Sequence, residues 1–377
     1  MLVSGYRVTA LTDAYPRFPQ KGTRMTHILA AGDHFVAATL FIDAIKAQSP
    51  REELTFSSLT LPWPHTPFGP IGSVHEASGS VPELIEALAG ARVAVTQMAP
   101  FTAEVFANAP DLRLISVCRG GPVNVDLEAA TKAGIIVSFA PARNAVAAAE
   151  FAIGLMLSAM RRIVTTDSEL KAGNWRGDYY AFENTGLELD GATVGLIGYG
   201  AIGRIVARVL LAFGATVLTY DPYANAAAIA ADGVEVVALD ELLRRSSVVS
   251  LHARLTPETQ HLLNAENLAL LPHGAVLVNS ARGGLLDYAP LPDLLRSGRL
   301  GALALDVYDV EPPPPEWPLF AAPNVVMTPH LAGATQQTAH RAASIVSADI
   351  ARFLAGEKPL HVANPLVWDA LAETARP

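Results

Sequence analysis

A six-residue stretch, Gly198-Tyr199-Gly200-Ala201-Ile202-Gly203, limits the possible folds of this chain more than any other feature, because glycine occupies its first, third and sixth positions. Residues 192–197 before it are apolar and predict a buried strand, and residues 201–213 repeat apolar side chains at helical spacing. A glycine-rich turn that ends a strand and opens a helix exposes backbone N–H groups to a phosphate. The stretch therefore predicts a dinucleotide-binding unit of strand, turn and helix.

The glycines of this unit have distinct expected roles. Gly198 permits the tight turn, Gly200 lets a pyrophosphate approach the backbone, and Gly203 lets the helix pack closely on the strand. The predicted phosphate-binding turn is completed by Tyr199, Ala201 and Ile202. Asp221 ends the next expected strand, where a carboxylate accepts hydrogen bonds from the ribose of NAD and repels the 2'-phosphate of NADP. The alternative is a glycine turn in an α/β protein that binds no nucleotide.

Strand and helix patterns alternate along most of the chain, which is typical of a parallel sheet with crossover helices. Expected strands begin at Thr26 and lie at 93–96, 114–117, 192–197, 216–220, 234–237, 248–251, 275–278, 302–305 and 325–328. The later strands, with the glycine turn among them, predict a doubly wound α/β sheet of the Rossmann type. Helices are expected near 102–108, at 144–162 with Asn144 as N-cap, at 201–213 and at 336–354. The last helix is expected to return to the first domain, and residues 1–24, 61–82 and 163–190 are expected to be irregular or loop-like.

Composition narrows the class of protein. Hydrophobic residues make up 51% of the 377 residues and charged residues 17%, so the chain can bury the cores of two domains, or of three small ones. A net charge of −9 gives no basic surface for nucleic acid or an anionic membrane. We expect no signal peptide and no membrane-spanning segment. The single cysteine, Cys118, excludes a disulfide framework, and no metal site is expected because the histidines lack ligand spacing.

Three segments after expected strands carry the residue types that reduction of a 2-keto acid requires. They are residues 279–284, 306–312 and 328–333. Ligands of open α/β sheets bind beyond the carboxyl ends of the strands, so these loops are expected to face the nucleotide. Arg282 can clamp a carboxylate and polarise a carbonyl, His330 can donate a proton near neutral pH, and Glu311 can orient the imidazole. Each residue alone is more often structural; their combination indicates catalysis.

With these motifs, the chain resembles the D-isomer-specific 2-hydroxyacid dehydrogenase family, which includes phosphoglycerate dehydrogenase, glyoxylate/hydroxypyruvate reductase and D-lactate dehydrogenase. The resemblance covers roughly residues 90–355 and rests on the glycine turn with Asp221, on the three catalytic segments and on residues 124–130. It implies an NAD-dependent oxidoreductase in which Arg282 clamps the substrate, Glu311 is the orienting carboxylate and His330 is the acid/base. The cofactor contacts that it implies are His252, Ala281, Asp306 and His330.

The resemblance also implies the domain organisation and the assembly. Residues 144–337 are expected to form the NAD-binding Rossmann domain. Residues 1–143 with 338–377 are expected to form a flavodoxin-like α/β substrate domain built from both chain ends. The expected partner is a small anionic 2-hydroxy or 2-keto acid, and the protein is expected to be a cytoplasmic homodimer without a C-terminal regulatory domain.

The expected substrate loop departs from that of phosphoglycerate dehydrogenases. Arg119, followed by Gly120 and Gly121, stands where the first glycine of a carboxylate-holding loop is usual. Its guanidinium is expected either to bind an extra anionic group of the substrate or to point away and pair with a surface carboxylate. Gln97 stands where an arginine that reaches the substrate phosphate is usual, which weakens a phosphoglycerate assignment unless Arg119 substitutes. Gln97, Arg119, Gly120, Gly121 and Arg282 are the expected substrate contacts.

The sequence leaves two further questions open, the choice of cofactor and the kind of enzyme. Arg254 replaces a proline of the adenosine pocket and favours a 2'-phosphate, against Asp221, although NAD remains the expected cofactor. The motifs do not choose between a phosphoglycerate dehydrogenase-like enzyme, a hydroxypyruvate/glyoxylate reductase, a sugar-acid reductase and an NAD(H)-sensing binding protein of corepressor type. Glu311 argues against a formate dehydrogenase, and Cys118 is expected to pack in its loop rather than to react.

Overall fold

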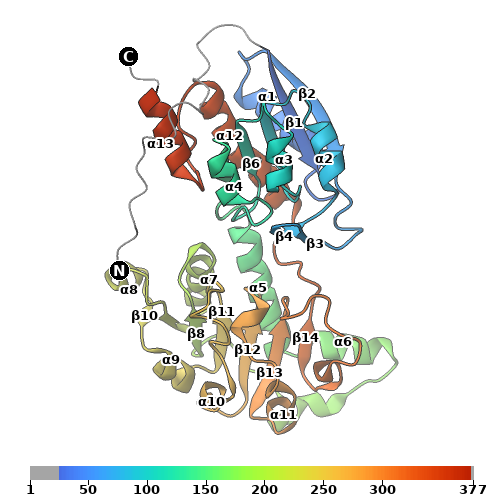
Figure 1. The fold of residues 1–377 in the computed structure, drawn as a ribbon. Helices are drawn as coiled ribbons and strands as arrows, with labels where there is room; N and C mark the ends of the chain where they lie inside the picture. Colours follow the sequence, from blue (N-terminus) through green and yellow to red (C-terminus); the bar gives the residue numbers. More distant parts are fainter. Residues whose placement is uncertain (1–24, 375–377) are drawn as a thin grey trace. The chain divides into compact units, whose positions relative to one another are not determined.

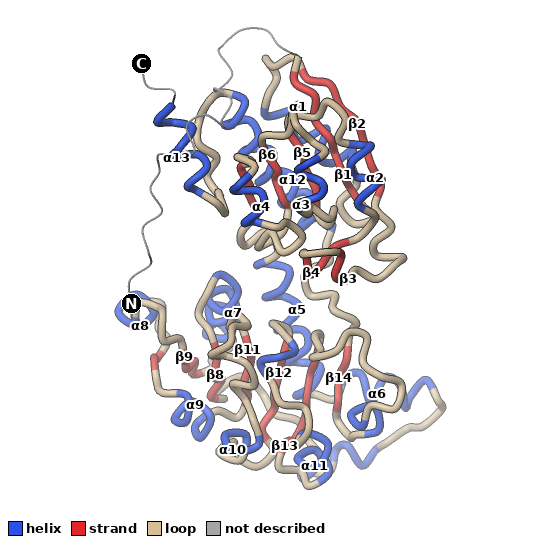
Figure 2. Tube along the Cα trace, in the orientation of Figure 1, coloured by secondary structure: helices blue, strands red, loops and turns tan. Residues whose placement is uncertain are grey.

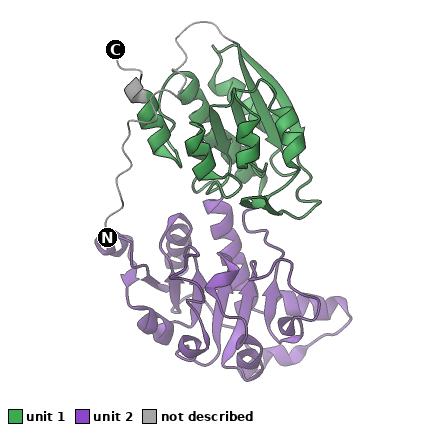
Figure 3. Cartoon of the chain, in the orientation of Figure 1, with its two compact units in different colours: residues 1–143, 335–377 green, residues 144–334 purple. Residues whose placement is uncertain are grey.

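The computed structural model describes residues 25–374. The chain divides into two compact units, which Figure 3 colours separately. We call residues 144–334 the central unit, and residues 1–143 with 335–377, which come from both ends of the chain, the split unit. The expected irregular segment 1–24 lies outside the described residues.

The central unit is built on a seven-stranded sheet, in which every pair of neighbouring strands is parallel. The strand order is β10-β9-β8-β11-β12-β13-β14, so the chain starts inside the sheet, winds to one edge and then crosses to the other (Figure 1). The strands are β8 (Thr193–Ile197), β9 (Thr216–Tyr220), β10 (Glu235–Val236), β11 (Val248–Leu251), β12 (Ala275–Asn279), β13 (Leu300–Leu305) and β14 (Val325–Met327). This order is the expected doubly wound Rossmann arrangement.

Helices cover both faces of the central sheet. Long, almost wholly apolar α5 (Ala145–Met160) and amphipathic α7 (Ala201–Ala212) bury their side chains against one face. The other face is covered by α9 (Leu239–Arg245), α10 (Ala265–Leu268) and α11 (Leu291–Arg296). The remaining helical segments are α6 (Ile163–Lys171), α8 (Ala226–Ala231) and the 3-10 turns Gly177–Tyr180, Phe182–Asn184, Gly283–Leu285 and Pro318–Ala321. Both faces are therefore sealed, and the strand ends with their loops remain to carry function.

The split unit has a smaller parallel sheet in the order β2-β1-β5-β6-β7, which is the flavodoxin-like order that the resemblance implied. Its strands are β1 (Thr26–Gly32), β2 (Leu54–Thr60), β5 (Val93–Thr96), β6 (Leu114–Val117) and β7 (Ile136–Phe139). One face packs on α1 (Ala38–Gln48), α12 (Gln336–Leu354) and α13 (Pro365–Thr374). The other face packs on α2 (Val81–Ala87), α3 (Ala103–Ala107) and α4 (Leu127–Lys132). In Figure 2 the strands of each unit lie between helices.

Helix α12 confirms the expectation that the end of the chain returns to the first domain. It spans the predicted residues, and Thr335 caps it by accepting a hydrogen bond from the Thr338 N–H at 3.1 Å. Its buried face joins the core formed by α1 and the small sheet. Within the described residues, no helix is both long enough and apolar enough to cross a bilayer.

Some expectations about local structure were wrong. Residues 163–190 are not simply loop, because α6 occupies their first part; it buries no side chain, so its sequence has no apolar stripe to reveal it. Residues 61–82 contain the antiparallel hairpin of β3 (Gly69–Ile71) and β4 (Val74–Ala77), which is too short to show alternation. Of the strand expected at 234–237, only the two exposed residues of β10 form a strand. Asn144 precedes α5 as predicted, but its side chain makes no capping hydrogen bond.

Candidate active site

The predicted phosphate-binding turn lies between β8 and α7, and its three glycines differ in surroundings. Gly198 has a φ of +100°, and a Cβ there would lie 2.7 Å from the Ala253 nitrogen. At Gly203 a Cβ would lie 2.4 Å from the Gly198 carbonyl oxygen. At Gly200 a Cβ would meet no heavy atom within 4 Å. Two glycines are thus required by the protein itself, whereas the space at Gly200 fits the approach of a pyrophosphate.

The other residues of the turn contribute mainly backbone. Ala201 is the exposed first residue of α7, and Ile202 packs against the core. The Tyr199 ring is buried, and its hydroxyl donates to Asp232 Oδ2 at 3.1 Å. Burial first, and then this hydrogen bond, raise the pKa of Tyr199 to about 12. The Tyr199 and Ile202 side chains therefore face the protein, and the N–H groups at the start of α7 are left for a ligand.

Asp221 lies at the end of β9, next to the turn. Its two carboxylate oxygens accept hydrogen bonds from the Tyr199 N–H at 2.8 Å and the Tyr223 N–H at 3.0 Å. Each oxygen keeps a lone pair, so the carboxylate can still accept hydrogen bonds from ribose hydroxyls. Arg254 is exposed, and no hydrogen bond from its guanidinium is seen within the described residues. The geometry at Asp221 fits NAD.

His252 follows β11 and faces the same turn, because its backbone carbon would contact a Cβ at Gly198. One ring nitrogen lies 3.0 Å from the Ser250 hydroxyl. Burial lowers the pKa of His252 to about 4, so the ring is neutral at pH 7. A neutral imidazole here offers packing and hydrogen bonding to a nucleotide rather than charge.

His330 and Glu311 form the central pair of the predicted catalytic residues. His330 Nδ1 lies 2.8 Å from Glu311 Oε2, and the Tyr308 N–H donates to Glu311 Oε1 at 3.0 Å. Burial alone would raise the pKa of Glu311, but the His330 hydrogen bond and charge, the Tyr308 N–H and Arg282 together lower it. Glu311 is therefore held as a carboxylate that fixes one ring nitrogen. The other nitrogen, Nε2, is the one left for chemistry on a side chain that is 42% exposed.

Asp306 organises the loop that carries His330. It is fully buried at the end of β13, and its oxygens accept hydrogen bonds from the Thr328 hydroxyl at 2.6 Å and from the Leu331 and Ala332 N–H groups at 2.8 Å. These bonds enclose His330, whose backbone has a left-handed φ of 55°. With its oxygens taken up by the loop, Asp306 serves first to hold the histidine in place.

Arg282 lies on the turn after β12, which the Asn279 side chain folds by accepting from the Ala281 N–H at 3.1 Å and donating to the Arg282 carbonyl at 3.0 Å. The next residue, Gly283, touches the Tyr308 backbone so closely that any Cβ would collide with it. That contact brings Arg282 to the Glu311 segment, and the guanidinium is exposed and close enough to lower the pKa of Glu311. The structure thus brings Arg282, Glu311 and His330 together.

In the split unit, Arg119 takes the second of its two expected arrangements. Its guanidinium pairs with the Glu76 carboxylate and also contacts the Glu76 carbonyl oxygen and the Met98 sulfur. Gln97 is buried, and the Cys118 thiol lies 3.8 Å from its Oε1. Around Gly120 and Gly121, a Cβ would meet no heavy atom within 4 Å. The glycines are open, whereas Arg119 is already neutralised and does not present a free cation.

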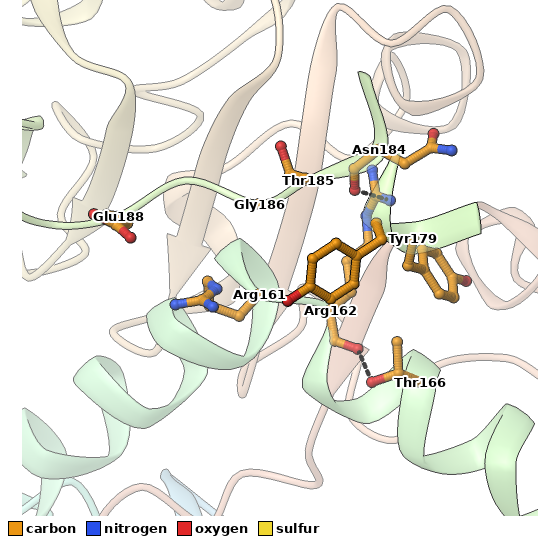
Figure 4. Close-up of a pocket in the computed structure, with 9 residues that line it drawn as sticks. Arg161, Arg162, Thr166, Tyr179, Asn184, Thr185, Gly186 and Glu188 are labelled. Carbon is orange, nitrogen blue, oxygen red and sulfur yellow. Dashed lines mark hydrogen bonds between the residues drawn. The ribbon is translucent and has the colours of Figure 1, made fainter. Parts of the chain in front are cut away.

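A pocket of about 480 Å³ lies elsewhere in the central unit, on the segment between α5 and β8 (Figure 4). Arg162 spans one side: it donates to the Asn184 carbonyl at 2.7 Å, and its guanidinium lies 5.5 Å from the centre of the Tyr179 ring. None of the sequence-predicted site residues lines this pocket. In the described part of the chain, no group of three or more His, Cys, Asp or Glu side chains could hold a metal ion.

The sequence did not reveal the supporting roles of three further residues of the site. Tyr308 supplies the N–H to Glu311, and its hydroxyl donates to the Thr328 carbonyl at 2.9 Å. Asn279 shapes the turn of Arg282. Thr328 anchors Asp306. All three lie inside the segments that the sequence identified as catalytic, so their position could have indicated a role in the site. Their contacts, however, can be known only from the folded structure.

Known proteins are similar to this chain in sequence and in architecture. Residues 153–332 match the family model described as D-isomer specific 2-hydroxyacid dehydrogenase, NAD binding domain. D-3-phosphoglycerate dehydrogenase of Mycobacterium tuberculosis strain H37Rv is 42% identical over 255 residues, which are 68% of this chain and 47% of that protein. Glyoxylate reductase of Korarchaeum cryptofilum is 38% identical over 265 residues, covering 70% of this chain and 80% of the relative. The match thus spans about half the length of the first relative and most of the second.

A solved structure agrees with these matches. D-lactate dehydrogenase from Escherichia coli superposes with a TM-score of 0.71 at 27% identity, covering 89% of this chain and 99% of that one. The likeness therefore extends over both units and beyond the segment that matches the family model.

Proposed function

The chain belongs to the D-isomer specific 2-hydroxyacid dehydrogenase family, and we propose that it transfers a hydride between a nicotinamide cofactor and C2 of a small 2-hydroxy or 2-keto acid. The observation that carries the proposal is the 2.8 Å contact between His330 Nδ1 and Glu311 Oε2, beside the exposed Arg282. A proton donor, its orienting carboxylate and a carboxylate clamp are the groups that this reaction needs from a protein.

The proposed mechanism divides the work among these residues. When bound, NADH supplies the hydride that reduces the carbonyl carbon. The Arg282 guanidinium holds the substrate carboxylate through its planar fork and polarises the carbonyl. The His330 Nε2–H donates a proton to the carbonyl oxygen as the alcohol forms, and in the oxidative direction the same nitrogen accepts it. Glu311 holds the ring through Nδ1 and so fixes its orientation.

The nucleotide side of the proposal uses the turn between β8 and α7. The N–H groups at the start of α7 bind the pyrophosphate, and the open space at Gly200 admits it. The Asp221 carboxylate accepts from the adenosine ribose, which favours NAD over NADP. From the family resemblance, we also propose that the protein acts as a cytoplasmic homodimer.

The test is NADH oxidation, followed by absorbance, against pyruvate, glyoxylate, hydroxypyruvate and 3-phosphohydroxypyruvate. We expect turnover of at least one of these acids and a preference for NADH over NADPH. Tight NADH binding without turnover of any acid would contradict the proposal and favour an NAD(H)-sensing binding protein.

A further inference from the structure

Two buried tyrosines of the central unit contact the segment that carries Glu311, and the proposed mechanism uses neither hydroxyl. Tyr288 precedes α11, and Tyr308 follows β13. They are 7% and 9% exposed, and both rings pack against Trp317, with ring centres 5.4 Å and 5.6 Å from that of the tryptophan. Packing explains the rings but not the hydroxyls, each of which must find an acceptor inside the protein.

Tyr308 connects Glu311 to the turn of His330. Its N–H donates to Glu311 Oε1 at 3.0 Å, and its hydroxyl donates to the Thr328 carbonyl oxygen at 2.9 Å. That same oxygen accepts the backbone N–H of His330 at 3.0 Å. Since Glu311 Oε2 lies 2.8 Å from His330 Nδ1, these contacts form a closed ring through Tyr308 and Thr328. One residue therefore fixes the carboxylate and the backbone of the histidine at once.

The backbone of His330 explains why such a restraint is needed. Its φ of 55° lies in the left-handed region, which is unfavourable for a residue with a Cβ. Its side chain is also 42% exposed, so packing alone does not hold the ring. In addition to the bonds of Asp306, the position of the imidazole therefore depends on its contact with Glu311 and, through the Thr328 carbonyl, on Tyr308.

Tyr288 acts on Glu311 across one peptide bond. Its hydroxyl donates to the Val307 carbonyl oxygen at 3.0 Å. This carbonyl and the Tyr308 N–H belong to one planar peptide, so a bond that fixes the carbonyl also fixes the direction of the N–H that reaches Glu311. Hydrogen bonds on both sides of a peptide also polarise it and strengthen each other. Tyr288 therefore orients the carboxylate through the peptide.

Both hydroxyls remain hydrogen-bond donors at neutral and mildly alkaline pH. Burial raises the pKa of Tyr308 to about 12, and the nearby carboxylates of Asp306 and Glu311 add to this effect. Burial likewise raises the pKa of Tyr288. Because neither group loses its proton near neutral pH, the hydroxyls act by position and not by proton transfer.

We propose that Tyr288 and Tyr308 are positioning residues for the proton transfer, whose hydroxyls hold Glu311 and His330 in contact and so keep the imidazole in the orientation for donation from Nε2. This inference rests on the proposed function, to which it adds two residues that act through Glu311 and His330. Tyr308 holds the turn of His330 and, through its N–H, the carboxylate, and Tyr288 holds the peptide that supplies this N–H. The alternative is that both hydroxyls only complete the hydrogen bonds of a packed core.

The variants that separate these readings are Tyr308→Phe and Tyr288→Phe, each of which keeps the ring on Trp317 and removes only the hydroxyl. Ser247→Ala, which also removes only a hydroxyl, is the matched control. The Ser247 hydroxyl donates to the Thr193 carbonyl oxygen at 3.2 Å, and the two residues lie at the amino ends of β11 and β8, opposite the strand ends that carry the site. For each protein we measure the unfolding free energy, the Kd for NADH, and kcat and KM for the keto acid that the wild type reduces fastest.

We expect kcat to fall about 10- to 100-fold in Tyr308→Phe and Tyr288→Phe, because an imidazole that is free to turn is less often in the reacting position. KM for the keto acid and the Kd for NADH should stay as in the wild type, since Arg282 and the nucleotide turn are unchanged. Ser247→Ala should keep the wild-type kcat, even where it loses as much unfolding free energy. Wild-type kcat in both tyrosine variants, or an equal fall of kcat in Ser247→Ala, would overturn the proposal. A fall confined to Tyr308→Phe would remove Tyr288 from it.

A spectroscopic measurement follows the pair without turnover and so separates this inference from the proposed function. Long-range ¹H–¹⁵N spectra of protein labelled at its histidines report which nitrogen of a neutral imidazole carries the proton, and His330→Ala assigns the signals. The bond to Glu311 places the proton on Nδ1, so we expect this tautomer in the wild type and in Ser247→Ala, and a mixture of tautomers in the two tyrosine variants.

The two measurements can fail independently. If no keto acid turns over but the tautomer of His330 changes as expected in Tyr308→Phe and Tyr288→Phe, the proposed function fails and the positioning of the pair stands. An unchanged tautomer in both tyrosine variants would overturn the positioning, whether or not the wild type reduces a keto acid.

Discussion

At the scale of a single residue, Glu311 makes the stability of the fold depend on pH, which can be tested. Its pKa in the folded protein is lowered, so ionised Glu311 stabilises the fold above the unfolded pKa of about 4.3, and this stability is lost as pH falls through the lower folded value. Glu311→Gln removes the titration. We expect the difference in unfolding free energy between wild type and variant, measured by urea denaturation from pH 7 to pH 3, to be constant near neutrality and to shrink at the acid end. A difference that grows as pH falls would contradict the assigned direction.

Asp306 is expected to matter through the loop that it holds. In Asp306→Asn an NH2 replaces one oxygen and cannot accept from a backbone N–H, so we expect a loss of about 1–3 kcal/mol in unfolding free energy. Because the loop also positions His330, kcat for keto-acid reduction should fall as well. Thr328→Val, which removes only the hydroxyl donor, is the control. If Thr328→Val costs as much stability and activity as Asp306→Asn, the backbone bonds do not hold the loop.

The sequence predicted the chemical roles of single residues better than it predicted the side chains with which they interact. Arg282, Glu311 and His330 were predicted from residue type and from their place after strands, and the structure brings them together. The Arg119 pairing was left open, because its partner Glu76 lies on β4, a strand that the sequence did not predict. Asp33 carries no motif, and only the fold shows that its Oδ2 is buried without a hydrogen-bond partner among the described residues.

The β8–α7 turn offers a matched pair of glycine variants at the scale of the element. Gly203→Ala places a methyl group against the Gly198 carbonyl, so we expect a loss of about 1–3 kcal/mol in unfolding free energy. Gly200→Ala meets no protein atom, so the fold should keep its stability while the Kd for NADH rises, because the methyl group occupies space that the pyrophosphate approaches. Urea denaturation and NADH fluorescence titration measure the two effects. Tight NADH binding by Gly200→Ala would show that the cofactor does not approach this turn.

Elements were predictable where burial imposes a pattern. The strands β5, β6, β11 and β12 are apolar runs buried on two faces, and α12 has one clear apolar stripe, so their positions followed from the sequence. The sequence did not predict β7 or the half-buried β2. Helix α6 buries nothing and β3 and β4 are three and four residues long, so neither leaves a periodicity to detect. The Asn144 side chain was predicted as a cap from its residue type, but its backbone, at φ −107° and ψ 12°, is not in the extended conformation typical of a cap.

At the scale of the whole molecule, the alternation of strands and helices predicted a parallel sheet with crossover helices, and the later strands predicted the doubly wound sheet of the central unit. The second, flavodoxin-like sheet was implied by the family resemblance, and α12 belongs to its unit. The type of each sheet was predicted, but the order of its strands is seen only in the fold. Substrate identity follows from neither, because it depends on which side chains meet in space.

The most direct test of the central claim is the effect of His330→Ala on keto-acid reduction, measured beside NADH binding by the same preparation. General acid catalysis by His330 predicts a fall in kcat of about 10²- to 10⁴-fold with an unchanged Kd for NADH, since the histidine acts on the substrate oxygen and not on the nucleotide turn. Retained turnover would remove His330 from the reaction. Loss of NADH binding in place of catalysis would make it a cofactor contact and contradict its role as the proton donor.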